Sequence, residues 1–346
     1  MCSCISVLPS SPASTNPLTV CTLLFPITPS LHLAPRIIVV YHKNTNVYPL
    51  RCRGRHLGGG SVMETAGTGV HRSGGVNHGR SDRLGIIGFG AIGRRLASFF
   101  ATTEDGPRTL ALLVRDHQRD AASALVPGAQ VCTDIEGFLE AVPTVAVECA
   151  SASALGTYGP RLLEASCDLI PLSLGAFADR ATERRLLEAA ARGPGRLEIA
   201  AGALGSIGFL AAAREHDLDR VTITIGYPIE RWRVMGAERF IDLDQVRSPT
   251  PFLESDARNV ATLFPGNLNV VTGASLAGLG LDRTHVALVA DPTVTQAWFQ
   301  VEASSASGPV RMHIGGRDAA VDADPIDYTT FSIIRLLKRR CASLAI

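Results

Sequence analysis

Arg83-Leu-Gly-Ile-Ile-Gly88-Phe-Gly90-Ala-Ile-Gly93-Arg-Arg-Leu-Ala97 joins an apolar strand pattern to a helical pattern through a Gly-x-Gly-x-x-Gly turn. Gly88 permits a tight turn after the strand, Gly90 lets the backbone approach a phosphate, and Gly93 lets the new helix pack against the sheet. Free backbone amides at the start of such a helix attract negative charge. The stretch predicts a dinucleotide-binding turn, in which Ala91 and Ile92 also contact the cofactor.

A second apolar strand, Thr109–Val114, follows this helix and ends at Arg115-Asp116. An acidic residue about twenty residues beyond the glycine turn is expected to bind the ribose hydroxyls of NAD, and Asp116 is the candidate. The alternative is that Asp116 is a solvated residue at the start of a loop. Positive groups beside it, at Arg115, His117 and Arg119, would suit the 2′-phosphate of NADP. The sequence therefore predicts NAD or NADP as cofactor, with NAD ranked first.

Short apolar runs alternate with amphipathic helical stretches from Arg83 onward, which indicates a parallel sheet with helices on both faces. The later strands expected in this sheet are Thr144–Glu148, Asp168–Ser173 and Leu197–Ala200, with a helix over Ala176–Arg192. After Gly202 the pattern changes to that of an α+β domain with a mostly antiparallel sheet, whose expected strands include Val221–Ile225, His285–Ala290 and Trp298–Ala303.

The predicted fold class is α/β, a Rossmann-type doubly wound parallel sheet followed by a second α+β domain. We expect the dinucleotide-binding domain over residues 81–201, a substrate and oligomerisation domain over 202–327, and a C-terminal helix over 328–346 that packs back on the first domain. Residues 1–80 have no sustained hydrophobic period. They are expected to be a disordered or targeting extension, or upstream sequence that precedes a true start at Met63; we favour the second.

The charge balance and the cysteine pattern argue against several classes of protein and of site. The 33 basic and 32 acidic residues leave no positive surplus for nucleic acid or an anionic membrane surface. The eight cysteines are scattered without a CxxC pair, so neither a metal site nor a disulfide framework is predicted.

Several segments of the chain, in order over about residues 83 to 335, resemble the L-aspartate dehydrogenase family of two-domain NAD(P) enzymes. The matching segments are Gly88–Gly93, Val147–Ser151, Leu172–Asp179, Ala201–Gly205, Phe264–Val270, Ala277–Thr284 and Val289–Pro292. The Phe-Pro-x-Asn-x-Asn-Val and Ala-Asp-Pro segments are more specific than the glycine turn.

The resemblance implies oxidation of L-aspartate to iminoaspartate, with hydride passing to the nicotinamide. It also implies a homo-oligomer that acts on a small amino-acid or keto-acid substrate, and we expect this enzyme to be cytoplasmic. The imine then hydrolyses to oxaloacetate and ammonia or feeds pyridine nucleotide biosynthesis. The family's nicotinamide-side contacts map to Ala203 and Asn269. A small residue at Ala203 leaves room for a flat ring, and Asn269 offers both a donor and an acceptor. The alternative for Asn269, and for Asn267, is helix capping or turn formation.

The chain departs from the family where the chemistry is expected. The family histidine that handles a proton falls on Phe299, or on Trp298 if the register shifts by one, and neither side chain is a general acid or base. The catalytic group is therefore unassigned. Gly226-Tyr227 stands where the family commonly has Arg-Lys, which removes cations suited to a dicarboxylate.

These departures leave two alternatives to aspartate oxidation. One is a dehydrogenase of a less charged amino or hydroxy acid, and the other is an NAD(P)-binding protein without catalysis. Arg231, Arg258 and Arg283 are candidate carboxylate clamps, with surface pairing as the alternative for each.

Overall fold

The computed structural model describes residues 82–342 except 104–105, 203, 267, 307 and 319–327, together with residue 344. For residues 316–318 and for three short strands near the N-terminus it describes the backbone alone. The chain divides into two units, Met1–Ser73 and Gly74–Ile346. In the first unit, β1 (Ser3–Val7), β2 (Leu18–Thr22) and β3 (Val40–Tyr41) pair in antiparallel fashion. The rest of the predicted extension lies outside the described residues.

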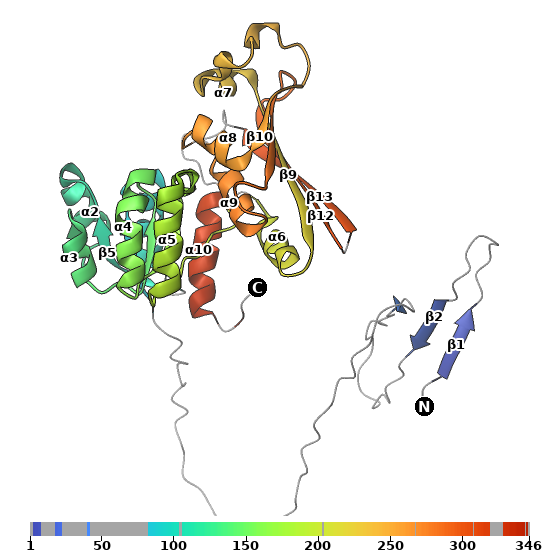
Figure 1. Ribbon diagram of the computed structural model, residues 1–346. Coiled ribbons are helices and arrows are strands. Elements are labelled where there is room, and N and C mark those ends of the chain that lie inside the picture. The colour runs from blue at the N-terminus through green and yellow to red at the C-terminus, as the bar shows by residue number, and fades with distance from the viewer. Residues whose placement is uncertain are drawn as a thin grey trace, which may run out of the picture. The chain divides into compact units, whose positions relative to one another are not determined.

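The second unit begins with a five-stranded parallel sheet in the order β6-β5-β4-β7-β8. Figure 1 shows helices packed around this sheet. Its strands are β4 (Arg83–Ile87), β5 (Arg108–Leu113), β6 (Gln130–Cys132), β7 (Val145–Glu148) and β8 (Asp168–Pro171). The strand order reverses direction between β4 and β7, and ligands of open α/β sheets bind at the carboxyl ends of the strands at such a switch point. The Rossmann-type prediction is confirmed.

Helices connect these strands. They are α1 (Ala91–Thr102), α2 (Arg119–Leu125), α3 (Ile135–Glu140), α4 (Ala152–Glu164) and α5 (Arg180–Arg192), with the 3₁₀ helices η1 (Asp116–Gln118) and η2 (Leu174–Ala178). Asp134, Ser151 and Asp179 accept hydrogen bonds from backbone N–H groups at the starts of α3, α4 and α5. Such side-chain caps stabilise helix termini. By contrast, α1 starts at Gly90 with no side-chain cap.

Two predicted elements differ from the structure. The helix expected over Ala176–Arg192 is divided, because Asp179 caps a new helix after η2. The strand expected over Leu197–Ala200 is reduced to a single bridge between Leu197 and Leu169. Beyond that bridge the chain leaves the edge of β8 and crosses to the second domain.

A second, mostly antiparallel sheet follows in the order β10-β11-β9-β12-β13. Its strands are β9 (Leu218–Tyr227), β10 (Thr250–Asp256), β11 (His285–Ala290), β12 (Gln296–Ser305) and β13 (Gly308–Asp318), of which only β9 and β11 pair in parallel. The helices of this domain are α6 (Ile207–Arg214), α7 (Ile229–Val234), α8 (Ala257–Leu263) and α9 (Asn269–Ala277), with the 3₁₀ helices η3 (Ala237–Arg239) and η4 (Leu243–Gln245). The prediction of a second α+β domain is confirmed.

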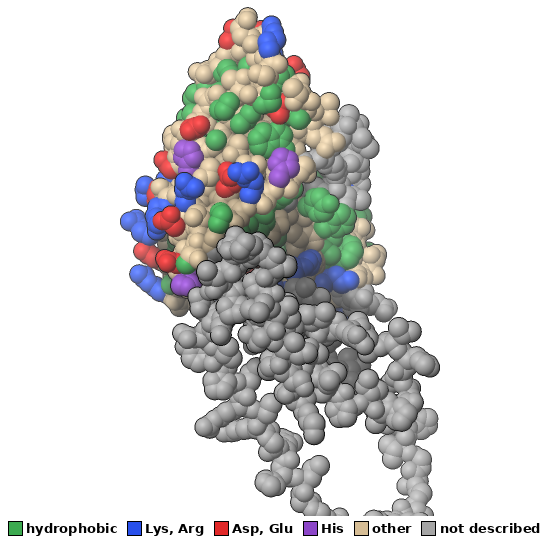
Figure 2. All heavy atoms as spheres, turned by 90° about the vertical axis from the view of Figure 1, so that its right-hand side faces the viewer, with side chains coloured by type: hydrophobic (Ala, Val, Ile, Leu, Met, Phe, Trp, Pro, Cys, Tyr) green, Lys and Arg blue, Asp and Glu red, His purple; other side chains and the backbone are tan. Residues whose placement is uncertain are grey.

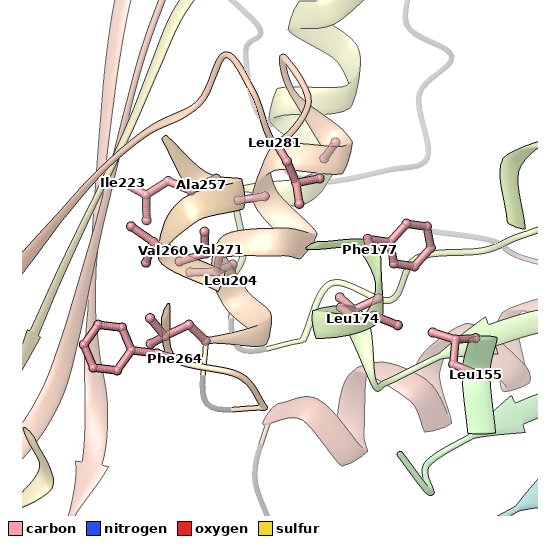
Figure 3. Close-up of a cluster of buried hydrophobic side chains, with 14 of the residues drawn as sticks. Leu155, Leu174, Phe177, Leu204, Ile223, Ala257, Val260, Phe264, Val271 and Leu281 are labelled. Carbon is pink, nitrogen blue, oxygen red and sulfur yellow. The ribbon is translucent and has the colours of Figure 1, made fainter. Parts of the chain in front are cut away.

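One hydrophobic core joins the two sheets. Figure 3 shows Ile223 of β9 on the side of Val260 of α8 and of Phe264 just after this helix, while Leu174 and Phe177 of η2 lie on the other side. All five side chains belong to one cluster of buried residues. Burial of this apolar surface holds the second domain against the loops that follow β7 and β8.

The C-terminal helix α10 (Tyr328–Cys341) packs on the first domain. Its Ile333 and Leu337 are fully buried in a cluster with Leu96 and Phe100 of α1. Arg340 at its end forms ion pairs with Asp82, Asp168 and Glu198. Within the described part of the chain, no helix is long and apolar enough to cross a membrane.

Candidate functional site

A cavity of about 480 Å³ opens at the carboxyl ends of β4, β5 and β7. It lies at the switch point of the first sheet, where the glycine turn, the loop after β5 and the start of α4 meet. Its lining comprises Ile87, Gly88, Phe89, Gly90, Leu113, Val114, Arg115, Asp116, Gln118, Thr133, Cys149, Ala150, Ser151, Ala154 and Tyr158. The cavity therefore contains Gly88, Gly90 and Asp116 of the residues predicted from sequence.

The three glycines of the turn meet different steric constraints. Gly88 has a φ of +102°, a conformation that L side chains rarely adopt. A Cβ at Gly93 would lie 2.1 Å from the Gly88 carbonyl oxygen, so α1 could not pack there with any larger residue. A Cβ at Gly90 would meet no protein atom within 4 Å. The protein itself does not require glycine at position 90, whereas a phosphate approaching the backbone would.

The start of α1 suits an anion. No side chain caps it, and its first turn carries no acidic residue. Ala91 is exposed as the first helical residue, and Ile92 after it is half-buried. The unpaired backbone N–H groups and the helix dipole together favour a phosphate group at this position. The residues present thus fit a dinucleotide.

Gln118 connects the two loops of this cavity, a role that the sequence analysis missed. Its side-chain oxygen accepts a hydrogen bond from Arg115 N at 3.2 Å, and its side-chain nitrogen donates to Phe89 O at 3.3 Å. The loop that carries Asp116 is thereby tied to the glycine turn. The spacing of three residues between Arg115 and Gln118 is that of a capping box and was the available signal.

A second cavity of about 250 Å³ lies between the first sheet and helices α6, α9 and α10. Its lining comprises Ile92, Pro171, Leu172, Leu174, Ala200, Ala201, Gly202, Leu204, Ile207, Asn269, Val270, Gly273 and Thr329. Ile92 and Asn269 of the sequence-predicted residues therefore lie here. Ala203 lies outside the described residues, between Gly202 and Leu204 of the lining.

Asn269 reaches across this cavity to the first domain. Its side-chain oxygen accepts a hydrogen bond from Gly175 N of η2 at 3.1 Å. Asn269 therefore does not cap its own helix in this structure but satisfies a free N–H group of η2. Its side-chain amide nitrogen has no hydrogen bond to another described residue, so it can donate to a ligand.

Phe299 and Trp298, to which the sequence analysis assigns the family histidine, lie on opposite faces of the second sheet. Phe299 is 8% exposed, belongs to the shared core and packs edge-to-face on Tyr227, with ring centroids 6.1 Å apart. The Trp298 indole donates to Asp291 Oδ2 at 3.0 Å and covers Gly226, where a Cβ would clash with its ring. Neither residue lines the two cavities described above.

Arg258 is committed to an ion-pair cluster between the domains. Its side chain on α8 is 11% exposed and binds Asp282 at 2.7 Å and Glu183 of α5 at 2.8 Å. It also donates to the carbonyl oxygens of Phe177 and Ala178 in η2. All of these partners belong to the protein, so Arg258 is not available as a substrate clamp. We call Arg258, Asp282, Glu183 and the two carbonyls the Arg258 cluster.

Comparison with known proteins assigns the family. Residues 88–199 match the NAD-binding domain family of homoserine dehydrogenase, and residues 209–340 match the aspartate dehydrogenase C-terminal family. The L-aspartate dehydrogenase of Ralstonia pickettii is 36% identical over 267 residues, which cover 76% of this chain and 99% of that protein. The chain belongs to the L-aspartate dehydrogenase family.

Two further similarities are consistent with this family assignment. The L-aspartate dehydrogenase of Cupriavidus necator is 35% identical over 266 residues, 76% of this chain and 99% of its own. The crystal structure of aspartate dehydrogenase from Thermotoga maritima shares the fold, with a TM-score of 0.60 and 24% identity over 77% of this chain and 99% of that one. The protein is therefore an NAD(P)-dependent oxidoreductase of this family, with a small-molecule substrate.

Proposed function

We propose that the protein oxidises L-aspartate at its α-carbon. One hydride and one proton leave the substrate, which becomes iminoaspartate, and water then converts the imine to oxaloacetate and ammonia. The match to the L-aspartate dehydrogenase of Ralstonia pickettii along 99% of its length is the observation that carries this proposal. The product is proposed to feed pyridine nucleotide biosynthesis.

Each of the two cavities would bind a different part of the cofactor. Gly90 and the first amides of α1 would bind the pyrophosphate, with Gly88 and Gly93 shaping the turn, and Asp116 would bind the adenine-side ribose. When bound, the nicotinamide accepts the hydride from the substrate. Asn269 would orient the nicotinamide end through its amide nitrogen, which has no hydrogen bond to another described residue, with Gly202 beside it. Ala203, which lies outside the described residues, is proposed as a further contact on the sequence alone. The apolar side chains around this second cavity would exclude water from it.

Asp116 is expected to decide between the cofactors. A carboxylate hydrogen-bonds ribose hydroxyls and repels a 2′-phosphate, so Asp116→Asn should weaken NADH binding about tenfold and weaken NADPH binding less or improve it. Fluorescence titrations of the full chain with both nucleotides check this. Asp120→Asn, on the neighbouring α2 and outside the cavity lining, is the matched control. Equal losses for both nucleotides would contradict the assignment of Asp116.

A second candidate is a dehydrogenase of a less charged amino or hydroxy acid. The specific observation in its favour is that the second cavity has no charged side chain among its described lining residues. Turnover of the full chain should be measured with L-aspartate and with neutral amino and hydroxy acids, using NAD and NADP. Turnover with aspartate supports the first proposal, and turnover with neutral acids alone supports the second. Cofactor binding with no turnover would instead indicate a cofactor-binding protein without catalysis.

Phe299→His tests the family alignment. Phe299 lines neither described cavity, so the test also asks whether position 299 reaches the substrate. If it does and aspartate is the substrate, an imidazole here is expected to raise aspartate turnover at least about tenfold, because a positioned acid or base contributes about 10²- to 10⁴-fold. Phe299→Leu removes the same ring without adding a proton-transfer group and should not raise turnover. Because Phe299 is buried against Tyr227, melting temperatures must accompany the kinetics. An unchanged rate in a folded variant would argue against aspartate or against the alignment.

We also propose a cytoplasmic homo-oligomer. Cys132, Cys149, Cys167 and Cys341 are free thiols, which is typical of a reducing compartment. Thr224 of β9 and Trp298 and Gln300 of β12 are half-buried on the face of the second sheet turned away from Ile223. Figure 2, which looks onto this side of the molecule, shows several hydrophobic side chains at the surface. Sedimentation equilibrium of the full chain tests the association.

A further inference from the structure

Glu148 is a buried carboxylate at the carboxyl end of β7. It is 1% exposed, and its Oε1 accepts hydrogen bonds from Ala150 N at 2.8 Å, Ser151 N at 2.9 Å and Ser173 Oγ at 2.9 Å. Its Oε2 accepts from Ser173 N at 3.2 Å. Burial raises the pKa of Glu148, and these hydrogen bonds oppose the rise. So costly a buried group persists only where its hydrogen bonds are satisfied.

The four donors belong to two different loops. Ala150 and Ser151 follow β7 and line the first cavity, whereas Ser173 follows β8 and stands between Leu172 and Leu174 of the second cavity. One carboxylate therefore sets the position of both cavity walls with respect to each other. No other described side chain hydrogen-bonds both loops.

A further hydrogen bond connects the loop after β8 to the second domain. Two residues beyond Ser173, Gly175 N donates to Asn269 Oδ1 at 3.1 Å. Glu148, Ser173, the short η2 segment and Asn269 thus form a continuous connection from the first cavity to α9. By comparison, Asp168 is 13% exposed and lies at the amino end of the neighbouring strand β8, where it binds Arg340 and lines neither cavity.

We propose that Glu148 is a positioning residue, which aligns the two halves of the cofactor site and couples them through Ser173 and Gly175 to Asn269. This rests on the proposed cofactor role of the two cavities. Glu148 acts through the loops and does not itself line either cavity. Glutamine at this position would keep the size but point an N–H donor at groups that are themselves donors.

NADH titration of the full chain is the first test. Glu148→Gln should weaken NADH binding about tenfold, since at least one loop hydrogen bond is lost. The matched control is Asp168→Asn, which removes an ion-paired, largely covered carboxylate of the same domain and should lower the melting temperature while leaving NADH affinity within about twofold. NADH affinity within twofold of wild type in Glu148→Gln, or an equal loss in Asp168→Asn, would overturn the proposal.

A double-mutant cycle tests the connection to the second domain. If Glu148 acts through η2 on Asn269, the variant combining Glu148→Gln with Asn269→Ala should bind NADH only about as weakly as the worse single variant. If the double variant instead loses NADH affinity by the product of the two single-variant losses, the two residues act independently and the coupling is contradicted.

Amide hydrogen exchange without cofactor separates this inference from the proposed function. Glu148→Gln should speed exchange at Ser173 and Gly175 but not at Leu169 in the centre of β8. Unchanged exchange would overturn the loop alignment. If exchange responds but the wild-type chain fails to bind NADH, the proposed cofactor role has failed and the alignment of the loops stands.

Discussion

Gly90→Val is expected to weaken NADH binding by at least about a hundredfold while leaving the fold intact. A Cβ at Gly90 meets no protein atom within 4 Å, so the side chain costs the folded protein little. The same side chain would stand where a pyrophosphate approaches the first amides of α1. Each hydrogen bond to a charged group contributes about 1.5–3 kcal/mol, so losing one or two of them gives this effect. Titration with NADH and thermal melting measure both quantities.

Two other glycines serve as controls for this result. Gly315 on β13 also has open surroundings, so Gly315→Val should change neither cofactor affinity nor the fold. Gly93→Val should lower both, because its Cβ would lie 2.1 Å from the Gly88 carbonyl oxygen. Normal NADH affinity in Gly90→Val would show that the phosphate does not approach the turn, and the proposed cofactor pose would be wrong.

Arg258→Met is expected to lower the free energy of unfolding by about 3–5 kcal/mol. Methionine preserves much of the apolar stem but removes the guanidinium that donates to Asp282, to Glu183 and to the carbonyls of Phe177 and Ala178. For a protein of this size the loss corresponds to a fall in melting temperature of roughly 10 °C. Because the partners come from both domains, cofactor affinity should fall as well. Calorimetry and NADH titration check the two effects.

Arg180→Met provides the contrast. Arg180 also pairs with Asp282 at 2.8 Å, but its side chain is 71% exposed, so its loss should cost at most about 1 kcal/mol. Losses of equal size in the two variants would contradict a special role for the Arg258 cluster.

The effect of Arg258→Met should also depend on pH. The Arg258 guanidinium, against the opposing effect of burial, holds the pKa of Asp282 below its ordinary value of 3.8. A carboxyl whose pKa is lowered on folding stabilises the protein fully above its ordinary pKa, and this contribution is lost as the pH falls through the lowered value. The difference between wild type and Arg258→Met should therefore shrink below about pH 4. A constant difference down to pH 2 would exclude this ion pair as its source.

Local patterns predicted most strands and helices of the first domain. The absence of a Cβ at Gly88 and Gly93 is a property of the residues themselves, and it permits a tight turn between a strand and a helix. In the second domain, His285–Ala290 was predicted as a strand and is the observed β11. The division of the helix at Asp179 was missed, because a cap competes with a helical pattern that continues through it.

The sequence by itself determined the Rossmann-type turn, the change to an antiparallel second domain and the family. Only the tertiary structure decided that Asn269 binds Gly175, that Arg258 forms its ion pairs and hydrogen bonds with protein groups, and that Glu148 joins two loops. Asn269 and Gly175 are 94 positions apart, and Arg258 and Glu183 are 75 apart. Turns and caps arise between neighbours in the chain, whereas these contacts depend on how the two domains pack, and no local spacing of residue types encodes that.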